Sequence, residues 1–401
     1  MGQLRTRKRG KTWEWSFEAA KVDGKRNMIS KGGYRTKADA IAAGTQVKAE
    51  YDQGGQKFTP TNISVADFLD YWLENHIKRN MEYSTYSNYN QMVRAQIKPA
   101  FGHYKLTSLS PEMVQKWVNE LTDRGYARSS INNFFCCLSG SMQYAILPCK
   151  YIKYNPCTGV KIGRVKEKKE QKEYREYILS KADYSRILDR FGENTNFYMP
   201  VQIGYNLGTR IGESYGINML EDIDFQNHEI HIRNQLIKEN GVWTYRHPKY
   251  DSVRTLKITA DFEKILHRHL INRKKNILQY GEYFTKSYID NSGKLIQLPA
   301  TMDVPLKEIY PICTKENGDI LTPESFKYCA RVVHYELGIP NFHYHSLRHT
   351  HGTILAENGA NPKTVMERLG HKNITTTMER YVFNTEKMQQ DAITIFESAI
   401  I

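Results

Sequence analysis

The residues between His345 and Tyr381 include more reactive side chains than any other window of this sequence. Arg348 follows His345 by three positions, so in a helix both side chains project from the same side. His371 and then Tyr381 complete the set. A guanidinium and two imidazoles can bind an anion, and a phenol beside them can attack it. This set suits an attack on a phosphate better than an attack on a carbonyl group.

Short helices are expected to hold these groups. Asn361 before Pro362 is typical of a helix cap followed by proline at the first helical position, and Gly370 is typical of a helix end. His371 should therefore lie just past the end of a helix. The polar segment 373–380 is expected to form another short helix before the tyrosine.

A metal site is the alternative hypothesis for this stretch, because histidines are crowded in it. His345 and His349 are spaced i, i+4, but Ser-Leu-Arg stands between them in place of the glutamate-containing sequence of a zinc protease. Arg348 would also repel a cation here, which disfavours a metal. Three histidines of the stretch are expected to be structural or to support the site: His343, His349 and His351.

Two sequences upstream add positive charge that this stretch lacks. In LGTRIGE, Gly208 permits a tight turn just before Arg210, and Glu213 is placed to hold the guanidinium. In HPKYDSVR, Lys249 is expected at the tip of a hairpin. Each sequence is weak evidence by itself.

Charge and composition limit the class of protein. The 401 residues, enough for two or three domains, contain 57 Lys and Arg against 43 Asp and Glu, a net charge of +14 with a pI near 9.2. Such an excess favours a polyanionic partner such as nucleic acid, with simple solubility as the alternative. No window approaches the ~20 apolar residues of a membrane span, and the basic N-terminus lacks the apolar region of a secretion signal. The six cysteines include no CxxC pair, which fits a reducing cytoplasm.

The N-terminal residues predict a small sheet packed on a helix. Aromatic and polar residues alternate over 12–20, which indicates a half-buried strand, and a second strand is expected over 26–30. A turn at Gly32-Gly33 should lead into a helix over 36–51. A ribbon with one basic face can enter a groove of DNA, although a solvated basic face is the alternative. The candidate DNA contacts are Arg7, Lys8, Arg9, Lys11, Arg26, Arg35 and Lys37.

The middle of the chain predicts a helical bundle. Capping signals at Ser64 and Ser110 precede apolar residues at helical spacing, and a helix beginning near Thr85 is expected to end before Pro99. A further helix is expected over 130–145. The charged run 161–175 then reads as a connector between domains.

The last part of the chain predicts a mixed domain. Helices are expected at 196–207, 210–216 and 261–279, strands at 229–236 and 254–258, and another helix from Thr322-Pro323 onward. Residues 281–313 fit no element and read as an insertion. We therefore expect the domains 1–58, 63–160 and 178–401, the last with a C-terminal tail helix, and a charged linker over 161–177.

Five motifs, taken in order, make this sequence similar to the tyrosine recombinases, in particular to the integrases of Gram-positive phages and conjugative transposons. They are GTRIGE, PKYDSVR, HSLRH, LGH and MERY. The resemblance covers nearly the whole chain. It implies a multidomain fold: a small β-sheet-plus-helix N-terminal module that binds arm-type DNA, an all-α helical bundle that binds core-type DNA, and a mixed, mainly-α catalytic domain with a small antiparallel sheet, like that of tyrosine recombinases and type IB topoisomerases.

The resemblance also implies a mechanism in which a tyrosine attacks a DNA phosphodiester and forms a 3′-phosphotyrosyl intermediate. Two arginines would neutralise the phosphate oxygens, one histidine would take the phenol's proton, another would donate to the phosphate, and a lysine would protonate the leaving 5′ oxygen. Lys238 and Lys257 are alternatives for that lysine. Neither a metal nor another cofactor is required. The residues implied are Arg210, Lys249, His345, Arg348, His371 and, as nucleophile, Tyr381.

The expected function is therefore site-specific recombination, which integrates or excises a mobile element in the bacterial cytoplasm. The implied partners are double-stranded DNA at core-type and arm-type attachment sites and further copies of the chain, as a homo-tetramer with segment 384–401 docked on a neighbouring copy. An excisionase or a host DNA-bending protein are possible additions. The alternatives are a non-catalytic DNA-binding regulator and a relaxing topoisomerase. The acidic cluster Glu221, Asp222 and Asp224 would suit a metal nuclease, but is expected to cap a turn.

Overall fold

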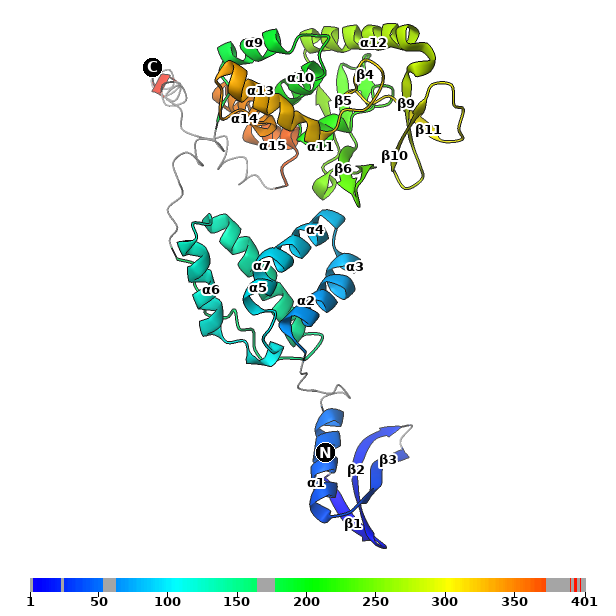
Figure 1. The fold of residues 1–401 in the computed structure, drawn as a ribbon, viewed down its shortest axis with the longest axis vertical. Helices are drawn as coiled ribbons and strands as arrows, with labels where there is room; N and C mark the ends of the chain where they lie inside the picture. The colour runs from blue at the N-terminus through cyan, green and yellow to red at the C-terminus, as the bar shows by residue number, and fades with distance from the viewer. Residues whose placement is uncertain are drawn as a thin grey trace. The chain divides into compact units, whose positions relative to one another are not determined.

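The computed structural model describes residues 3–22, 25–52, 63–163 and 177–372, together with 390, 393, 394 and 397. The chain divides into two compact units, 1–166 and 167–401. Figure 1 shows the ribbon of both units, which are described separately below. No helix among the described residues is long and apolar enough to cross a membrane.

The N-terminal module is a three-stranded antiparallel sheet in the order β1-β2-β3, covered on one face by a helix (Figure 1). Trp15 and Phe17 point from β2 toward the helix and are buried with Ala40. The first strand is an addition to the predicted pair, because its basic residues carry no apolar alternation. The elements are β1 (Arg5–Arg9), β2 (Thr12–Val22), β3 (Lys25–Tyr34) and α1 (Lys37–Asp52).

The turn predicted at Gly32-Gly33 is wrong, because β3 continues through both glycines to its end. Trp15 pairs with Lys31 and Trp13 pairs with Tyr34, so β3 contains one extra residue at this point. Gly33 has φ +98°, a conformation that glycine adopts without strain. The two glycines therefore make a β-bulge, which bends the strand without ending it.

The rest of the first unit is a helical bundle, as expected. The caps predicted at Ser64 and Ser110 are confirmed, since each hydroxyl accepts a hydrogen bond from the backbone three residues later. The elements are α2 (Val65–Trp72), the π-turn η1 (Leu73–Ile77), α3 (Lys78–Asn80), α4 (Tyr83–Met92), the π-turn η2 (Val93–Ile97), α5 (Lys98–Phe101), the 3₁₀ turn η3 (Leu106–Ser108), α6 (Pro111–Asp123) and α7 (Arg128–Ile146).

The predicted helix end before Pro99 is wrong. The chain stays helical to Phe101, because the π-turn η2 comes just before the proline and Lys98 donates its backbone N–H to the carbonyl of Val93. The wider turn leaves Pro99 in the first turn of α5, where its missing N–H is tolerated. Apolar periodicity does not distinguish such a turn from an ordinary helical one.

The second unit combines helices with small antiparallel sheets (Figure 1). Its helices are α9 (Lys181–Arg190), α10 (Tyr198–Leu207), α11 (Ile211–Tyr215), α12 (Ala260–Tyr280), α13 (Phe326–Leu337), α14 (Tyr344–Glu357) and α15 (Pro362–Leu369), with 3₁₀ turns η4 (Lys249–Asp251), η5 (Gly281–Tyr283) and η6 (Pro323–Ser325). Its strands are β4 (Ile223–Asp224), β5 (Glu229–Ile232), β6 (Gln235–Glu239), β7 (Val242–Arg246), β8 (Arg254–Lys257), β9 (Thr285–Ile289), β10 (Leu295–Pro299) and β11 (Lys307–Ile309).

The strand predicted over 229–236 is two strands in different sheets. β5 joins β4 and β8, whereas β6 pairs only with β7 in a hairpin. The hairpin turns at Asn240 and Gly241, whose φ angles of +49° and +83° match the turn that favours Asn-Gly. Lys249 is therefore not at a hairpin tip, as predicted, but in the 3₁₀ turn η4 between β7 and β8.

The insertion over 281–313 is also ordered, against the expectation that it forms no element. Its strands make a three-stranded antiparallel sheet in the order β10-β9-β11, which we call the insertion sheet. These strands have only three to five residues each, too few for a clear alternation in the sequence.

The core of the second unit centres on α10, which is buried along most of its length. α10 packs on α14, and a Cβ on Gly204 would lie 2.8 Å from the Leu347 side chain. This close contact fixes the two helices that lead into the candidate site.

Candidate active site

Arg210 begins a helix directly after a tight turn, as the sequence predicts. α10 ends at Gly208, which has φ +64°, and Arg210 is the N-cap residue of α11. A Cβ on Gly208 would lie 2.6 Å from the His351 ring. Glycine is therefore required here both for its backbone conformation and for space.

The guanidinium of Arg210 is held from three directions. It donates to the Glu213 carboxylate at 2.6 Å, to the carbonyl of Gly370 at 2.6 Å and to the hydroxyl of Ser252 at 3.3 Å. The side chain is 24% exposed. The guanidinium is thus oriented by the protein while part of it faces solvent, where it can meet a ligand.

Glu213 is fully buried and shared by two arginines. Its second oxygen accepts from the backbone N–H of Arg210 at 3.0 Å and from Arg254 at 2.8 Å. Burial by itself would raise the pKa of Glu213, but Arg254 and then Arg210 outweigh it and hold the pKa below its usual value. One negative charge faces two positive charges, so the cluster keeps a net charge that suits an anion.

Arg254 is the residue of this cluster that the sequence reasoning missed. Besides its ion pair with Glu213, its Nε donates to the carbonyl of Arg368 at 2.8 Å, and Nη1 donates to that of Ser252 at 3.1 Å. A Cβ on Gly370 would lie 2.8 Å from Arg254 Nη1. The signal was present, because Arg254 ends the PKYDSVR motif.

Arg348 approaches the same turn from α14. It is 2% exposed, and its Nη1 donates to the carbonyl of Gly208 at 2.8 Å. One turn earlier, the Tyr344 hydroxyl hydrogen-bonds to that of Ser214 in α11. These contacts fix α14 to the loop that carries Arg210, so the structure brings the two predicted arginines to the two sides of one turn.

His345 lies on α14 one helical turn before Arg348 and is partly buried. Its ring meets the His349 ring edge to face, with 5.7 Å between centroids. Neither ring belongs to a group of three possible metal ligands among the described residues.

His371 follows the end of α15, as predicted. Asn361 caps this helix by accepting from the backbone N–H of Lys363, and Gly370 closes it with φ +66°. Because Arg210 is bonded to the carbonyl of Gly370, the backbone next to His371 is held at the arginine cluster.

Lys249 is exposed in η4, three residues before Ser252. Ser252 accepts from Arg210, so the end of this segment touches the arginine cluster. The alternatives lie elsewhere: Lys238 pairs with Glu324 at 3.2 Å, and Lys257 pairs with Glu229 at 2.9 Å.

Several predicted features lie outside the described residues. Among these are Tyr381, the helix expected over 373–380, most of the segment 384–401 and most of the linker 161–177. The side chain of Arg26 is also outside the described part.

His351 has a structural role. Its Nε2 accepts from Arg368 at 2.9 Å, so its Nδ1 carries the proton that is donated to the carbonyl of Tyr205 at 2.8 Å. Burial, followed by the charge of Arg368, lowers the pKa of His351 to about 4. The ring is therefore neutral at physiological pH. His343 is the N-cap of α14, and burial lowers its pKa as well.

Two residues of the acidic cluster cap turns, as expected, whereas Glu221 pairs with Lys307 at 2.8 Å. Asp222 accepts from the backbone N–H of Asn218, and Asp224 accepts from those of Gln226 and Asn227. Among the described residues one group could hold a metal ion, namely Asp224, Glu229 and His231. It includes none of the six predicted catalytic residues.

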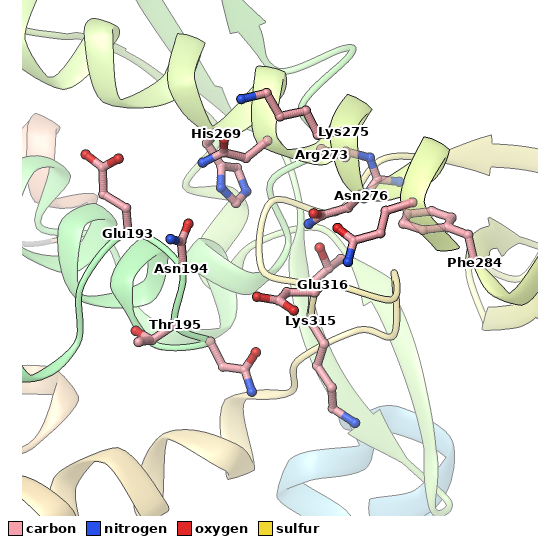
Figure 2. Close-up of a pocket in the computed structure, with 14 residues that line it drawn as sticks. Glu193, Asn194, Thr195, His269, Arg273, Lys275, Asn276, Phe284, Lys315 and Glu316 are labelled. Atoms are coloured by element: carbon pink, nitrogen blue, oxygen red, sulfur yellow. The ribbon is translucent and has the colours of Figure 1, made fainter. Parts of the chain in front are cut away.

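A hollow of about 450 Å³ lies in the second unit away from these residues. Figure 2 shows its walls, with His269 and Arg273 from α12 facing the loop of Glu193 and the turn of Glu316. Its lining includes none of the six predicted catalytic residues. The candidate site around the partly exposed Arg210 therefore lies outside this hollow.

The N-terminal module presents arginines on the sheet face opposite α1. Arg7 pairs across the sheet with Glu14, whereas Lys8 pairs with Trp13, whose side chain is on the helix side. Glu14 forms ion pairs with Arg7 at 3.3 Å and with Arg9 at 2.7 Å. The basic face predicted from the sequence thus contains the carboxylate of Glu14 among its arginines.

Two family models match this chain. The model described as phage integrase family matches residues 177–388, and the model for the phage integrase N-terminal SAM-like domain matches residues 64–122. The chain belongs to the phage integrase family. The predicted resemblance to tyrosine recombinases is confirmed, and with it site-specific recombination as the function.

Relatives of this integrase-family chain include a tyrosine recombinase, a transposon transposase and a phage integrase. A XerC-like tyrosine recombinase of Caldanaerobacter subterraneus is 25% identical over 91% of each chain. The transposase of transposon Tn916 from Enterococcus faecalis is 25% identical over 72% of this chain and 66% of the relative. The integrase of Staphylococcus phage L54a is 24% identical over 80% of this chain and 89% of the relative.

Solved integrases share the fold. The Tn1549 transposon integrase in complex with transposon right end DNA has a TM-score of 0.62 at 21% identity, and the match covers 83% of this chain and 99% of that one. A lambda integrase dimer bound to a core site has a TM-score of 0.54 at 14% identity and covers 96% of this chain and 95% of that one. The predicted fold class is thereby confirmed.

Proposed function

We propose that this recombinase cleaves and rejoins duplex DNA through a covalent 3′-phosphotyrosyl intermediate on Tyr381, and so integrates or excises a mobile element. The observation that supports this best is the cluster around Gly208 and Gly370, in which Arg210 and Arg348 are each oriented by a backbone carbonyl. Two oriented guanidiniums are what a phosphodiester requires, because it has two non-bridging oxygens to neutralise.

The two arginines act mainly on the transition state. When the nucleophile attacks, negative charge accumulates on the non-bridging oxygens, and preoriented donors stabilise that charge without moving. Arg210 is held by Glu213 and Gly370, so its position is set before DNA binds. His371, next to Gly370, adds a further donor to the phosphate.

The nucleophile needs help because a phenol has a pKa near ~10. In our proposal His345 takes the proton of Tyr381 as the oxygen attacks phosphorus. His345 shares one side of α14 with Arg348, so the base and the anion clamp come from the same helix. The phosphotyrosyl ester keeps the energy of the phosphodiester, and a 5′ hydroxyl of another strand can reverse the reaction without ATP.

Lys249 is the proposed general acid for the departing 5′ oxygen. It is exposed, and Ser252 at the end of its segment contacts Arg210. Lysine and arginine supply the positive charge that a metal ion supplies in many other nucleases. Cleavage is therefore expected to continue in EDTA, and complete loss of activity in EDTA would contradict this assignment.

A nicked duplex that traps the covalent intermediate tests the nucleophile. The duplex is taken from the DNA that flanks the gene of this recombinase. Wild-type protein should form a covalent protein–DNA adduct, and Tyr381→Phe should form none while it binds the duplex with similar affinity. Tyr335→Phe, which changes an exposed tyrosine on α13, is the matched control and should form the adduct normally. An adduct with Tyr381→Phe would refute the nucleophile assignment.

Double-stranded DNA and further copies of this chain are the proposed partners. The lambda integrase neighbours include a tetramer bound to a Holliday junction. We propose the same arrangement here, with arm-type DNA bound to the N-terminal module. An excisionase or a DNA-bending protein is a further proposed partner. Sedimentation of the protein with and without its attachment duplex measures the assembly, and a monomer on synapsed DNA would contradict it.

A further inference from the structure

The insertion sheet touches the hairpin that precedes Lys249. Two-stranded hairpins such as β6-β7 are weak on their own and need support from other elements. One side of this hairpin is backed by α11, since a Cβ on Gly212 of α11 would lie 3.3 Å from the carbonyl oxygen of Leu236 in β6. The support for the outer edge of β7 comes from the turn between β9 and β10.

Three consecutive residues of β7 are held by that turn, which consists of residues 290–294. Thr244 forms an isolated bridge with Lys294. Tyr245 donates its backbone N–H to the carbonyl of Gly293 at 2.8 Å. Arg246 donates through Nη1 to the carbonyl of Ser292 at 2.8 Å. The contact therefore fixes β7 up to its last residue, three positions before Lys249.

The turn 290–294 is itself well ordered by hydrogen bonds. The Asp290 carboxylate accepts from the backbone N–H groups of Ser292 and Lys294 at 2.8 and 2.9 Å. Gly293 has φ +79°, and a Cβ there would lie 2.5 Å from the carbonyl oxygen of Tyr245. The turn and the strand thus approach as closely as glycine allows.

The segment that follows β7 is anchored at both ends. Gln235 of β6 donates to the carbonyl of His247 at 2.9 Å, and Arg210 and Arg254 donate to Ser252 at 3.3 and 3.1 Å. Lys249 lies between these anchors. The position of Lys249 relative to Arg210 therefore depends on the hairpin. The position of β7, the outer strand of that hairpin, depends in turn on residues 290–294.

We propose that the turn 290–294 of the insertion sheet is a positioning device for the general acid: by holding β7 it sets where Lys249 delivers its proton. This inference rests on the proposed function, in which Lys249 is that acid. It also gives residues 281–313 a role in catalysis without any contact to the reacting atoms.

The step concerned is the departure of the 5′ oxygen. The bond between the Tyr381 oxygen and phosphorus forms, the bond between phosphorus and the 5′ oxygen breaks, and a proton moves from the Lys249 ammonium to that oxygen. If sulfur replaces the 5′ oxygen, the leaving group is a thiolate, which is stable without a proton because thiols ionise near pH ~8.5. A sulfur substrate therefore does not need the acid.

The test compares single-turnover adduct formation on oxygen and 5′-sulfur versions of the same attachment duplex, with the full-length chain. Gly293→Ala should be at least about tenfold slower than wild type on the oxygen substrate and within about twofold of it on the sulfur substrate. The reason is that only the oxygen leaving group needs the proton of Lys249, which the variant displaces. Lys249→Ala should show the same rescue. Gly281→Ala is the matched control, since Gly281 also has positive φ but a Cβ there meets nothing within 4 Å. It should match wild type on both substrates.

The outcomes are separable. If Gly293→Ala is equally slow on both substrates, or normal on both, while Lys249→Ala is rescued by sulfur, the positioning role is refuted and the acid stands. If sulfur does not rescue Lys249→Ala, both the acid and its positioning are refuted, although an adduct with wild type still supports recombination. The sulfur reaction also shows that the variant is folded. Arg246→Gln removes the contact to Ser292 together with the ion pair to Glu239, and the same rescue by sulfur is expected.

Discussion

Glu213 shows how a single buried residue can organise a site that binds anions. Without a partner a buried carboxylate would be protonated, and without a carboxylate two neighbouring arginines would repel each other. Together they form a stable cluster in which Arg254 faces inward, with 9% of its side chain exposed, and Arg210 is 24% exposed. The same carboxylate thus keeps Arg254 in the fold and orients Arg210 at the proposed phosphate site.

Glu213→Gln should destabilise the second unit by about 3 kcal/mol at neutral pH, since it leaves Arg254 buried without its counter-charge. It should also lower the rate of adduct formation, because Arg210 loses its orienting partner. Chemical denaturation and the nicked-duplex assay measure the two effects. Glu336→Gln, which breaks an exposed ion pair with Arg190, is the control. It should leave the stability and the rate of adduct formation nearly unchanged. A stable and fully active Glu213→Gln variant would contradict this role.

The pH dependence of stability should reflect two groups with lowered pKa. The contribution of ionised Glu213 is fully present above its ordinary value of 4.5 and is lost as the pH falls toward its lower folded pKa. His351 is buried neutral, so its contribution is present above pH 6.5 and declines as the pH falls toward about 4. The unfolding free energy should therefore begin to fall below pH 6.5, by about 3 kcal/mol for the histidine. In His351→Gln the unfolding free energy should not fall between pH 6.5 and pH 4.5. Denaturation at several pH values measures this difference from wild type.

At the scale of elements, the site depends on how α14 is attached to α11. The hydroxyl of Tyr344 hydrogen-bonds to Ser214, and Ser214 in turn contacts Thr209, all of them buried. This chain of hydroxyls links the helix that carries His345 and Arg348 to the loop that carries Arg210. Packing of α10 on α14 could tolerate small shifts, but a chain of buried hydrogen bonds has few alternative arrangements.

Tyr344→Phe should destabilise the second unit by about 1–2 kcal/mol, because it leaves the Ser214 hydroxyl without one partner in a buried position. Adduct formation should slow more than DNA binding weakens, since the arginines lose their mutual alignment. Thermal unfolding, anisotropy with labelled duplex and the adduct assay separate these effects. An adduct rate equal to that of wild type would show that α14 is aligned by packing alone.

The sequence predicts those elements whose information is local. Ser64, Ser110 and Asn361 cap helices because a cap needs only its own next few residues. The π-turn before Pro99 and the insertion sheet were missed, since a π-turn leaves no mark on apolar periodicity and short strands are defined by their partners. For the site, residue types and order predict that Arg210 and Arg348 come together, and the structure places them on the two sides of the Gly208 turn. The contact of Arg254 with Glu213 depends on the fold and could not be predicted. The contact between β7 and the turn 290–294 could not be predicted for the same reason.

At the scale of the whole chain, the arginines of β1 in the first module are gathered on one face of its sheet. The first module places arginines on the face of β1 that is opposite α1, and Glu14 lies among them. These ion pairs are exposed on the arginine side and contribute little to stability. Their effect on DNA is larger, because each carboxylate near a phosphate offsets one arginine.

Glu14→Gln should strengthen binding to duplex DNA and steepen its dependence on salt, since Arg7 and Arg9 become available to phosphates. The slope of log affinity against log salt should change by about one. Anisotropy titrations at several salt concentrations measure the slope. Glu120→Gln on α6 is the control, because it changes net charge equally without touching the module. An unchanged slope in Glu14→Gln would indicate that this face does not bind DNA.

The hydrogen bond from Arg348 to Gly208 joins residues 140 positions apart. A ribosome adds ~5–20 residues per second, so on the order of ten seconds pass between the synthesis of these two ends. The first unit, residues 1–166, is synthesised before either of these two residues. The first unit can therefore fold before the two arginines of the proposed phosphate site are brought together.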